Sequence, residues 1–265
     1  MLDFIQNLKA RNETMFYFGL ICLVFSIICL VLTKTSSVQV NNVSAWYKPF
    51  KFASSTFFFI WAMAWYCYYL PNFNINLFNW SIIALLGFEI IYIAIQAARG
   101  QLSHFNMSTP TYASLYSLMA FAASAATIYT AYVGYLFFTT NFPELPSYYV
   151  WAIRLGLLIF VIFSFEGFVM GSKLTHTIGG ADGGPSLPVL NWSTKFGDPR
   201  IAHFIGMHAL QVLPILSYFL FKNSKITFVF AALYFLLALF TLVQALKGKP
   251  LFKSKSEQMA SNQQN

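Results

Sequence analysis

The residues of this chain best suited to chemistry lie in one otherwise apolar stretch, 196–214. It opens with Asp198, Pro199 and Arg200, an acid and a proline at positions where helices begin. The apolar run that follows is interrupted by four polar side chains, Arg200, His203, His208 and Gln211. At about 100° per residue, Arg200 and Gln211 share one helix face, and the two histidines flank that face by about 60–80°. One side of this helix is therefore polar and ionisable, as a metal, haem or proton-handling site requires.

The other histidines and two acids are predicted to lie toward the same side of a membrane. His104 follows the third apolar segment of the chain, and His176 follows the fifth. Glu89 lies roughly 15 Å inside the third segment and Glu166 about 8 Å inside the fifth, counted from the ends nearest these histidines. The predicted metal ligands are His104, His176, His203 and His208. The predicted catalytic acids are Glu89, Glu166 and Asp198. Three side chains are predicted to bind a cofactor, the arginines as clamps for a phosphate, carboxylate or haem propionate: Arg99, Arg200 and Gln211.

The spacing of the two helical histidines limits how a metal could be bound. His203 and His208 are five residues apart, roughly 140° around a helix, so they cannot chelate one ion from the same face. At most one of them joins a given metal with His104 or His176. His208 is the stronger candidate, because it lies about 12 Å into its segment, where ionisable groups are rare and usually functional. For the loop histidines, His104 and His176, the alternative to metal binding is a simple hydrogen bond at the membrane interface.

The elements that must position these residues are membrane helices. Hydrophobic residues make up 58% of the chain and charged residues only 9%, against roughly 25% charged residues in soluble domains. The apolar segments lack the alternation of β-barrel strands. Seven of them are long enough to cross a hydrocarbon core of about 30 Å: 15–33, 52–70, 79–98, 111–138, 148–171, 201–220 and 226–246. We predict an all-α integral membrane protein, a bundle of about seven transmembrane helices, with one domain (1–246) and a basic, flexible tail (247–265).

Lysines and arginines are divided unevenly between the two sides of this predicted bundle. Eleven fall on the side of the four histidines and four on the other side, and positive residues gather on the cytoplasmic side of membrane proteins. The N-terminus is therefore predicted outside and the C-terminus in the cytoplasm, and we expect the cytoplasmic membrane of a bacterium as the location. The same bias explains the net charge of +8, so no nucleic-acid partner is expected.

Two loops on the histidine side have an unusual composition. The segment 46–51 is aromatic and basic, and we interpret it as an interfacial anchor. The long loop 172–198 contains a glycine-rich run, 179–185. Such a run suits a loop that covers a ligand and equally suits a flexible connection. It is not a phosphate-binding Walker motif, because no Gly-Lys-Ser/Thr follows.

Three functions are compatible with these residues, and they leave open whether the chain is an enzyme. The first is a metal or haem site in the cytoplasmic leaflet that performs redox or hydrolytic chemistry on a lipophilic molecule from the bilayer. The second is a proton-coupled carrier of a small solute in which Glu89, Glu166 and His208 titrate, although no pair of broken helices supports it. The third is a non-catalytic subunit or assembly factor whose polar side chains hold helices together.

Overall fold

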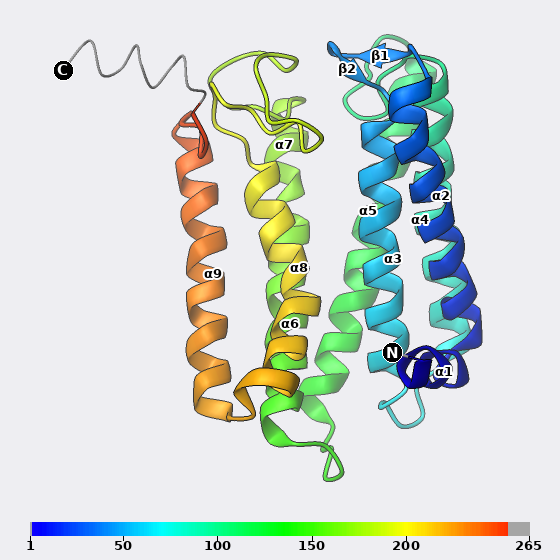
Figure 1. Cartoon of the computed structure of the whole chain (residues 1–265), viewed down its shortest axis with the longest axis vertical. Coiled ribbons are helices and arrows are strands. Elements are labelled where there is room, and N and C mark those ends of the chain that lie inside the picture. The colour runs from blue at the N-terminus through cyan, green and yellow to red at the C-terminus, as the bar shows by residue number, and fades with distance from the viewer. Residues whose placement is uncertain (1, 254–265) are drawn as a thin grey trace, which may run out of the picture.

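The computed structural model describes residues 2–253, which fold into an upright bundle of helices (Figure 1). Its long helices are α2 (Glu13–Thr35), α3 (Tyr47–Cys67), α4 (Ile75–Ala98), α5 (Pro110–Thr139), α6 (Ser147–Phe165), α8 (Arg200–Leu216) and α9 (Ser224–Leu246). Shorter helical pieces are α1 (Leu2–Arg11), α7 (Gly167–Lys173) and the π-helical turn η1 (Ser217–Phe221). The strands β1 (Gln39–Val40) and β2 (Val43–Ser44) pair antiparallel, with Val40 opposite Val43.

Six stretches of the described residues are long and apolar enough to cross a membrane. They are α2, α4, α5, α6 together with α7 (Ser147–Lys173), α8 together with η1 (Arg200–Phe221), and α9. The prediction of an all-α, multi-pass membrane protein is therefore confirmed. Helix α3 is not in this set. It begins with Lys48 and Lys51 and continues into Ser54, Ser55 and Thr56, so its apolar run is shorter than those of its neighbours.

Short polar side chains fix where several helices begin. Asn12, Asn74 and Thr109 each accept a hydrogen bond from the backbone N–H three residues further on. This satisfies a donor that the first helical turn leaves free. Helix α8 begins at Arg200, where the carboxylate of Asp198 accepts a hydrogen bond from the Arg200 backbone N–H at 3.2 Å. The predicted start pattern therefore lies immediately before the helix.

The predicted fifth span, 148–171, is divided in two. Helix α6 ends at Phe165 and α7 starts at Gly167, with Glu166 at the junction. Glycine is a poor helix former, and the side chain of Glu166 is turned inward, with 4% of its area exposed. The break therefore directs a carboxylate into the interior.

The half of the bundle that contains α1 holds the main hydrophobic core. Phe137 and Ile153 are completely buried there, in a core shared by the helices α2 to α6 and α8. Helices α6 and α8 approach closely through Gly156 and Gly206. A Cβ atom at Gly206 would come within 2.0 Å of the Phe163 ring. Small residues of this kind let membrane helices pack at short range.

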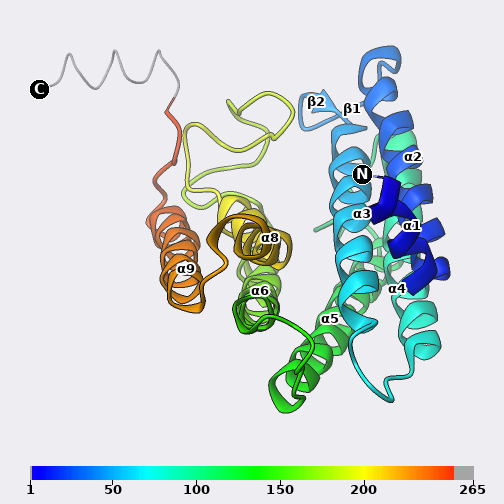
Figure 2. The same cartoon turned by 60° about the horizontal axis from the view of Figure 1, so that its bottom comes forward.

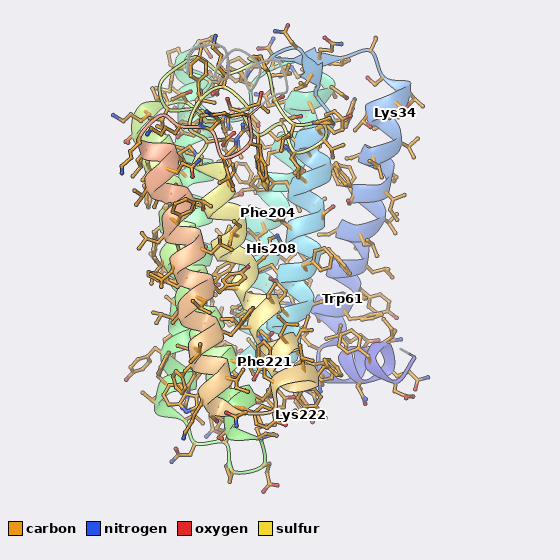
Figure 3. The ribbon with its side chains drawn as sticks, turned by 60° about the vertical axis from the view of Figure 1, so that its left-hand side comes forward. Lys34, Trp61, Phe204, His208, Phe221 and Lys222 are labelled. Carbon is orange, nitrogen blue, oxygen red and sulfur yellow. The ribbon has the colours of Figure 1, made fainter. Side chains whose placement is uncertain are left out.

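The loops divide between the two ends of the bundle (Figures 1 and 2). Helix α1 lies across one end, while the β hairpin and the loops 99–109 and 174–199 lie at the other, which we call the loop end. Lys34 and Lys222 mark the two ends in Figure 3. Helix α9 finishes at the loop end, and beyond it Phe252 stacks on Trp192 with ring planes 6° apart. Of the predicted tail 247–265, residues 254–265 lie outside the described residues.

Candidate functional site

A cavity of about 630 Å³ lies at the loop end of the bundle. Helices α3, α4 and α5 form one side of it, α7 and α8 form the other, and the loops 99–109 and 174–199 complete the wall. Figure 2 shows α3 and α4 on one side and α8 on the other. The lining helices carry small residues at this level, among them Ser54, Ser55, Ala120, Ala123, Gly167 and Gly171. Such residues leave space in a bundle that is close-packed elsewhere, and the volume falls within the range of about 300–1,000 Å³ typical of small-molecule sites.

All four histidines line this cavity. His104 comes from the loop after α4, His176 from the loop after α7, and His203 and His208 from α8. Side chains from three separate parts of the sequence are therefore brought to one cavity wall. The structure places both helical histidines there although they are five residues apart.

His176 and Asp182 form a hydrogen-bonded pair in the long loop. His176 Nδ1 lies 2.7 Å from Asp182 Oδ2, and the hydroxyls of Thr175 and Thr177 also donate to this carboxylate. Burial lowers the pKa of His176 to about 4, although the hydrogen bond to Asp182 opposes this. Burial would raise the pKa of Asp182, but its donors, His176 first, outweigh burial and hold that pKa below its ordinary value. Near neutral pH the imidazole is therefore uncharged, with Nδ1–H donating to Asp182.

A second histidine and carboxylate face each other where α6 meets α7. His203 Nδ1 lies 3.4 Å from Glu166 Oε2, within ion-pair distance but without the geometry of a hydrogen bond. The ring of His203 packs against Gly167, where an added Cβ would lie 3.4 Å from His203 Cε1. The break between α6 and α7 thus places the Glu166 carboxylate on the Nδ1 side of the His203 ring. Because His203 itself lines the cavity, two histidines of the lining each have a neighbouring carboxylate.

Aromatic rings surround the other two histidines. The ring centre of His104 lies 5.8 Å from that of Phe52, and that of His208 lies 4.4 Å from Phe204 and 6.4 Å from Phe58. Figure 3 shows Phe204 and His208 on successive turns of α8. Burial, with smaller contributions from nearby positive charges, lowers the pKa of His104 well below its ordinary value. His104 is therefore neutral near pH 7.

The cavity lining does not assemble a metal site. Among residues 2–253, no three side chains of histidine, cysteine, aspartate or glutamate lie close enough together to hold one ion. Binding of a metal or haem by the four histidines thus remains a prediction to which this geometry adds no support. The observed partners of His176 and His203 are carboxylates, the arrangement that general acid–base catalysis uses.

The predicted acid Glu89 lies in the cavity wall. Only 3% of its area is exposed, and its Oε1 has no hydrogen-bond partner among the described residues. Neither Arg99 nor Arg200, the partners expected for it, forms an ion pair with Glu89 in the part of the chain that the structure describes. Arg99 is exposed at the end of α4 and does not line the cavity.

The remaining predicted residues divide between the cavity wall and the structure that supports it. Arg200 lines the cavity, and its guanidinium binds the carboxylate of Asp198 and the carbonyl oxygen of Asn191. Asp198 is 1% exposed and does not line the cavity. Gln211, three residues beyond His208, also lies outside the lining, and its buried Oε1 has no hydrogen-bond partner within residues 2–253.

Two residues of the site were not predicted, Lys48 and Asp182. Lys48 lies in the segment interpreted as an interfacial anchor, yet it lines the cavity together with Asp182. A usable signal exists for Asp182, since acids are few in this chain, eight in all, and this one follows His176 by six residues. The glycine-rich run also takes part, because Gly183 and Gly184 line the cavity.

The chain matches no protein-family model, no curated protein sequence and no solved structure. Its function must therefore be inferred from the residues of the cavity and their geometry.

Proposed function

We propose that this protein binds a lipophilic molecule in the cavity and acts on its polar group by general acid–base chemistry. His176 and His203 are the proton-transferring residues. The observation that supports this is that both histidines line one cavity and each has its own carboxylate, Asp182 or Glu166, on the Nδ1 side. A carboxylate hydrogen-bonded at Nδ1, as in His176, fixes the ring and its tautomer and leaves Nε2 for the substrate, and Glu166 offers His203 a carboxylate on the same side.

The rest of the lining favours a lipophilic substrate. Large apolar side chains face the cavity between the polar groups: Phe52, Phe58, Ile93, Met119, Phe165 and Phe168. Apolar walls bury the body of a ligand, while a few polar groups fix its orientation. Hydrolysis and proton abstraction both require a base and an acid on one bound molecule, and the neutral imidazole of His176 can accept a proton at Nε2.

We also propose that the protein crosses the membrane seven times, with α3 as the seventh span. Helix α3 stands beside α2 and α4, and α1 and the last turn of α9 lie at opposite ends of the bundle (Figure 1). Opposite ends require an odd number of crossings. The excess of lysine and arginine at the loop end supports a cytoplasmic position for the cavity and an N-terminus outside.

Turnover of a lipid extract tests the proposed chemistry. The purified protein in lipid nanodiscs is incubated with an extract of total membrane lipids from its host, and consumed species are followed by mass spectrometry. We expect the wild type to convert a lipophilic species, and His176→Asn and His203→Asn each to slow this about 100-fold or more, the usual contribution of a general acid or base.

The matched control is Glu144→Gln in the turn at the opposite end, where the side chain is exposed. It should leave the rate unchanged, while Glu166→Gln, which removes the charge behind His203, should lower it. The proposal fails if the His176→Asn/His203→Asn double variant converts the species as fast as the wild type, or if the wild type converts nothing.

A further inference from the structure

Lys48 brings to the cavity an amine that forms no ion pair with any described group. It lies in the first turn of α3 and lines the cavity. Within residues 2–253, its Nζ takes part in no ion pair, and no carbonyl accepts from it as one does from the neighbouring Lys51. Burial disfavours the ammonium form of this amine, which keeps its proton in the cavity only where an anion accompanies it.

Except for Glu89, the other ionisable groups nearby with opposite or like charge are already engaged. Lys51 Nζ donates to the carbonyl oxygen of Leu190 at 2.7 Å, and Arg200 is paired with Asp198. The carboxylate of Asp182 accepts from His176 and from two threonines. With His104 and His176 neutral, Lys48 in its ammonium form gives the polar end of the cavity an unbalanced positive charge. It therefore suits a ligand that brings a negative one.

The cavity also opens sideways between α3 and α8. Phe58 of α3 and Phe204 of α8 both line the cavity, and 50% and 44% of their areas are exposed. The ring centre of His208 lies 6.4 Å from that of Phe58 and 4.4 Å from that of Phe204, which Figure 3 shows one turn away on α8. Two large apolar side chains that remain this exposed show that they do not close the wall between α3 and α8 by packing against each other. In a bundle that crosses a bilayer, this opening faces the acyl chains.

We infer that the cavity takes a single-chain amphiphile with an anionic oxygen headgroup, a carboxylate or a phosphate. Lys48 binds the headgroup, and the alkyl chain leaves the cavity between Phe58 and Phe204 into the bilayer. This inference rests on the proposed function, because it names the ligand class of the same cavity. It adds a headgroup charge, a binding residue and a lateral route, none of which the acid–base chemistry requires.

Binding of three probes with the same alkyl chain tests the inference. Radiolabelled dodecanoate, dodecyl phosphate and dodecanol are measured against immobilised protein in nanodiscs. We expect the wild type to bind both anions about 10-fold or more tightly than the alcohol, the effect of one hydrogen bond between charged groups. Lys48→Met should reduce both anions to the affinity of dodecanol, and Lys48→Arg should retain their advantage. Lys222→Met, an exposed lysine at the opposite end, should change nothing.

The route is tested by the rate of association. The double variant Phe58→Trp/Phe204→Trp narrows the opening and should slow the association of dodecanoate. Adding Lys48→Met to this double variant should still weaken the affinity for dodecanoate. Equal affinity for all three probes in wild type and Lys48→Met, in variants with wild-type melting temperatures, would overturn the headgroup inference and leave the proposed function standing. If no probe binds, dodecanol included, both the headgroup inference and the proposed function are contradicted. An unchanged association rate in the tryptophan variant would overturn the lateral route.

Discussion

The buried carboxylate of Asp198 holds together the loop that covers the cavity. Its two oxygens accept hydrogen bonds from the Arg200 side chain, from the Arg200 backbone N–H and from the backbone N–H of Ser193. Arg200 also donates to the carbonyl oxygen of Asn191. The start of α8 and the segment 191–193 are thereby joined through one acid. With its oxygens occupied and its side chain outside the cavity lining, Asp198 is better suited to position the loop than to transfer protons.

We expect Asp198→Ala to destabilise the protein by about 3 kcal/mol, because it leaves the Arg200 guanidinium largely buried without its counterion. The check is the thermal unfolding of detergent-purified protein, followed by tryptophan fluorescence. Asp3→Ala, which removes an exposed acid from α1, is the matched control and should melt as the wild type does. Equal melting temperatures for the two variants would mean that the Asp198–Arg200 pair does not hold the loop.

Some residues of the cavity can be predicted from the sequence, and others cannot, for a physical reason. Glu89 and His208 stand out because an ionisable group inside an apolar segment must be buried with a partner or a purpose. Lys48 and Asp182 lie in loops or at a helix end, where polar residues are ordinary. Their importance comes from the cavity that they share, and that contact between distant segments has no local pattern.

At the scale of elements, the long loop 174–199 acts as an ordered cover. Two isolated bridges, Ile178 with Gly197 and Ser186 with Ser193, tie it to itself. Gly197 passes so close to α9 that an added Cβ would lie 1.9 Å from a backbone oxygen there. Of the two sequence interpretations of its glycine-rich run, the geometry favours the ligand-covering loop, because the run is part of the cavity wall.

This loop should lose stability as the pH falls. The pKa of His176 lies near 4 in the folded protein and near 6.5 ordinarily, so between these values the unfolded state binds more protons. The stability is therefore complete above about pH 6.5 and declines as the pH falls toward 4. His104, whose pKa is also lowered, acts in the same direction. Asp182, with an ordinary pKa of 3.8 that is lowered further, contributes only below this window.

We expect the melting temperature of the wild type to drop between pH 7 and pH 4.5 and that of His176→Gln to drop less, since glutamine can still donate to Asp182 but does not titrate. Melting curves across this range in one buffer series provide the measurement. Parallel slopes for the two proteins would show that His176 is not buried as a neutral imidazole.

At the scale of the whole molecule, hydropathy predicts which segments are helices but not how they stand together. The predicted spans match α2 to α9 within a few residues at most ends, because insertion into a bilayer depends on the composition of each segment alone. Close packing depends on small residues at the contacts between helices, such as Gly156 of α6 and Gly206 of α8, each of which faces the other helix. The short helix α1 was not predicted, since it is only 10 residues long. The cavity follows from packing and therefore cannot be read from hydropathy.

The number of spans depends on α3, and cysteine labelling decides it. The three native cysteines are buried and should not react with a membrane-impermeant maleimide applied to intact cells. If α3 crosses the membrane, single cysteines at Asn41 and Asn72, which flank it and are exposed, must be labelled from opposite sides. With the N-terminus outside, we expect Asn72→Cys to react in intact cells and Asn41→Cys only after permeabilisation. Lys249→Cys, beyond α9, should behave like Asn41→Cys.

Labelling of both Asn41→Cys and Asn72→Cys from one side would show that α3 does not cross the membrane and would leave six crossings. The cavity would then no longer open onto acyl chains through Phe58.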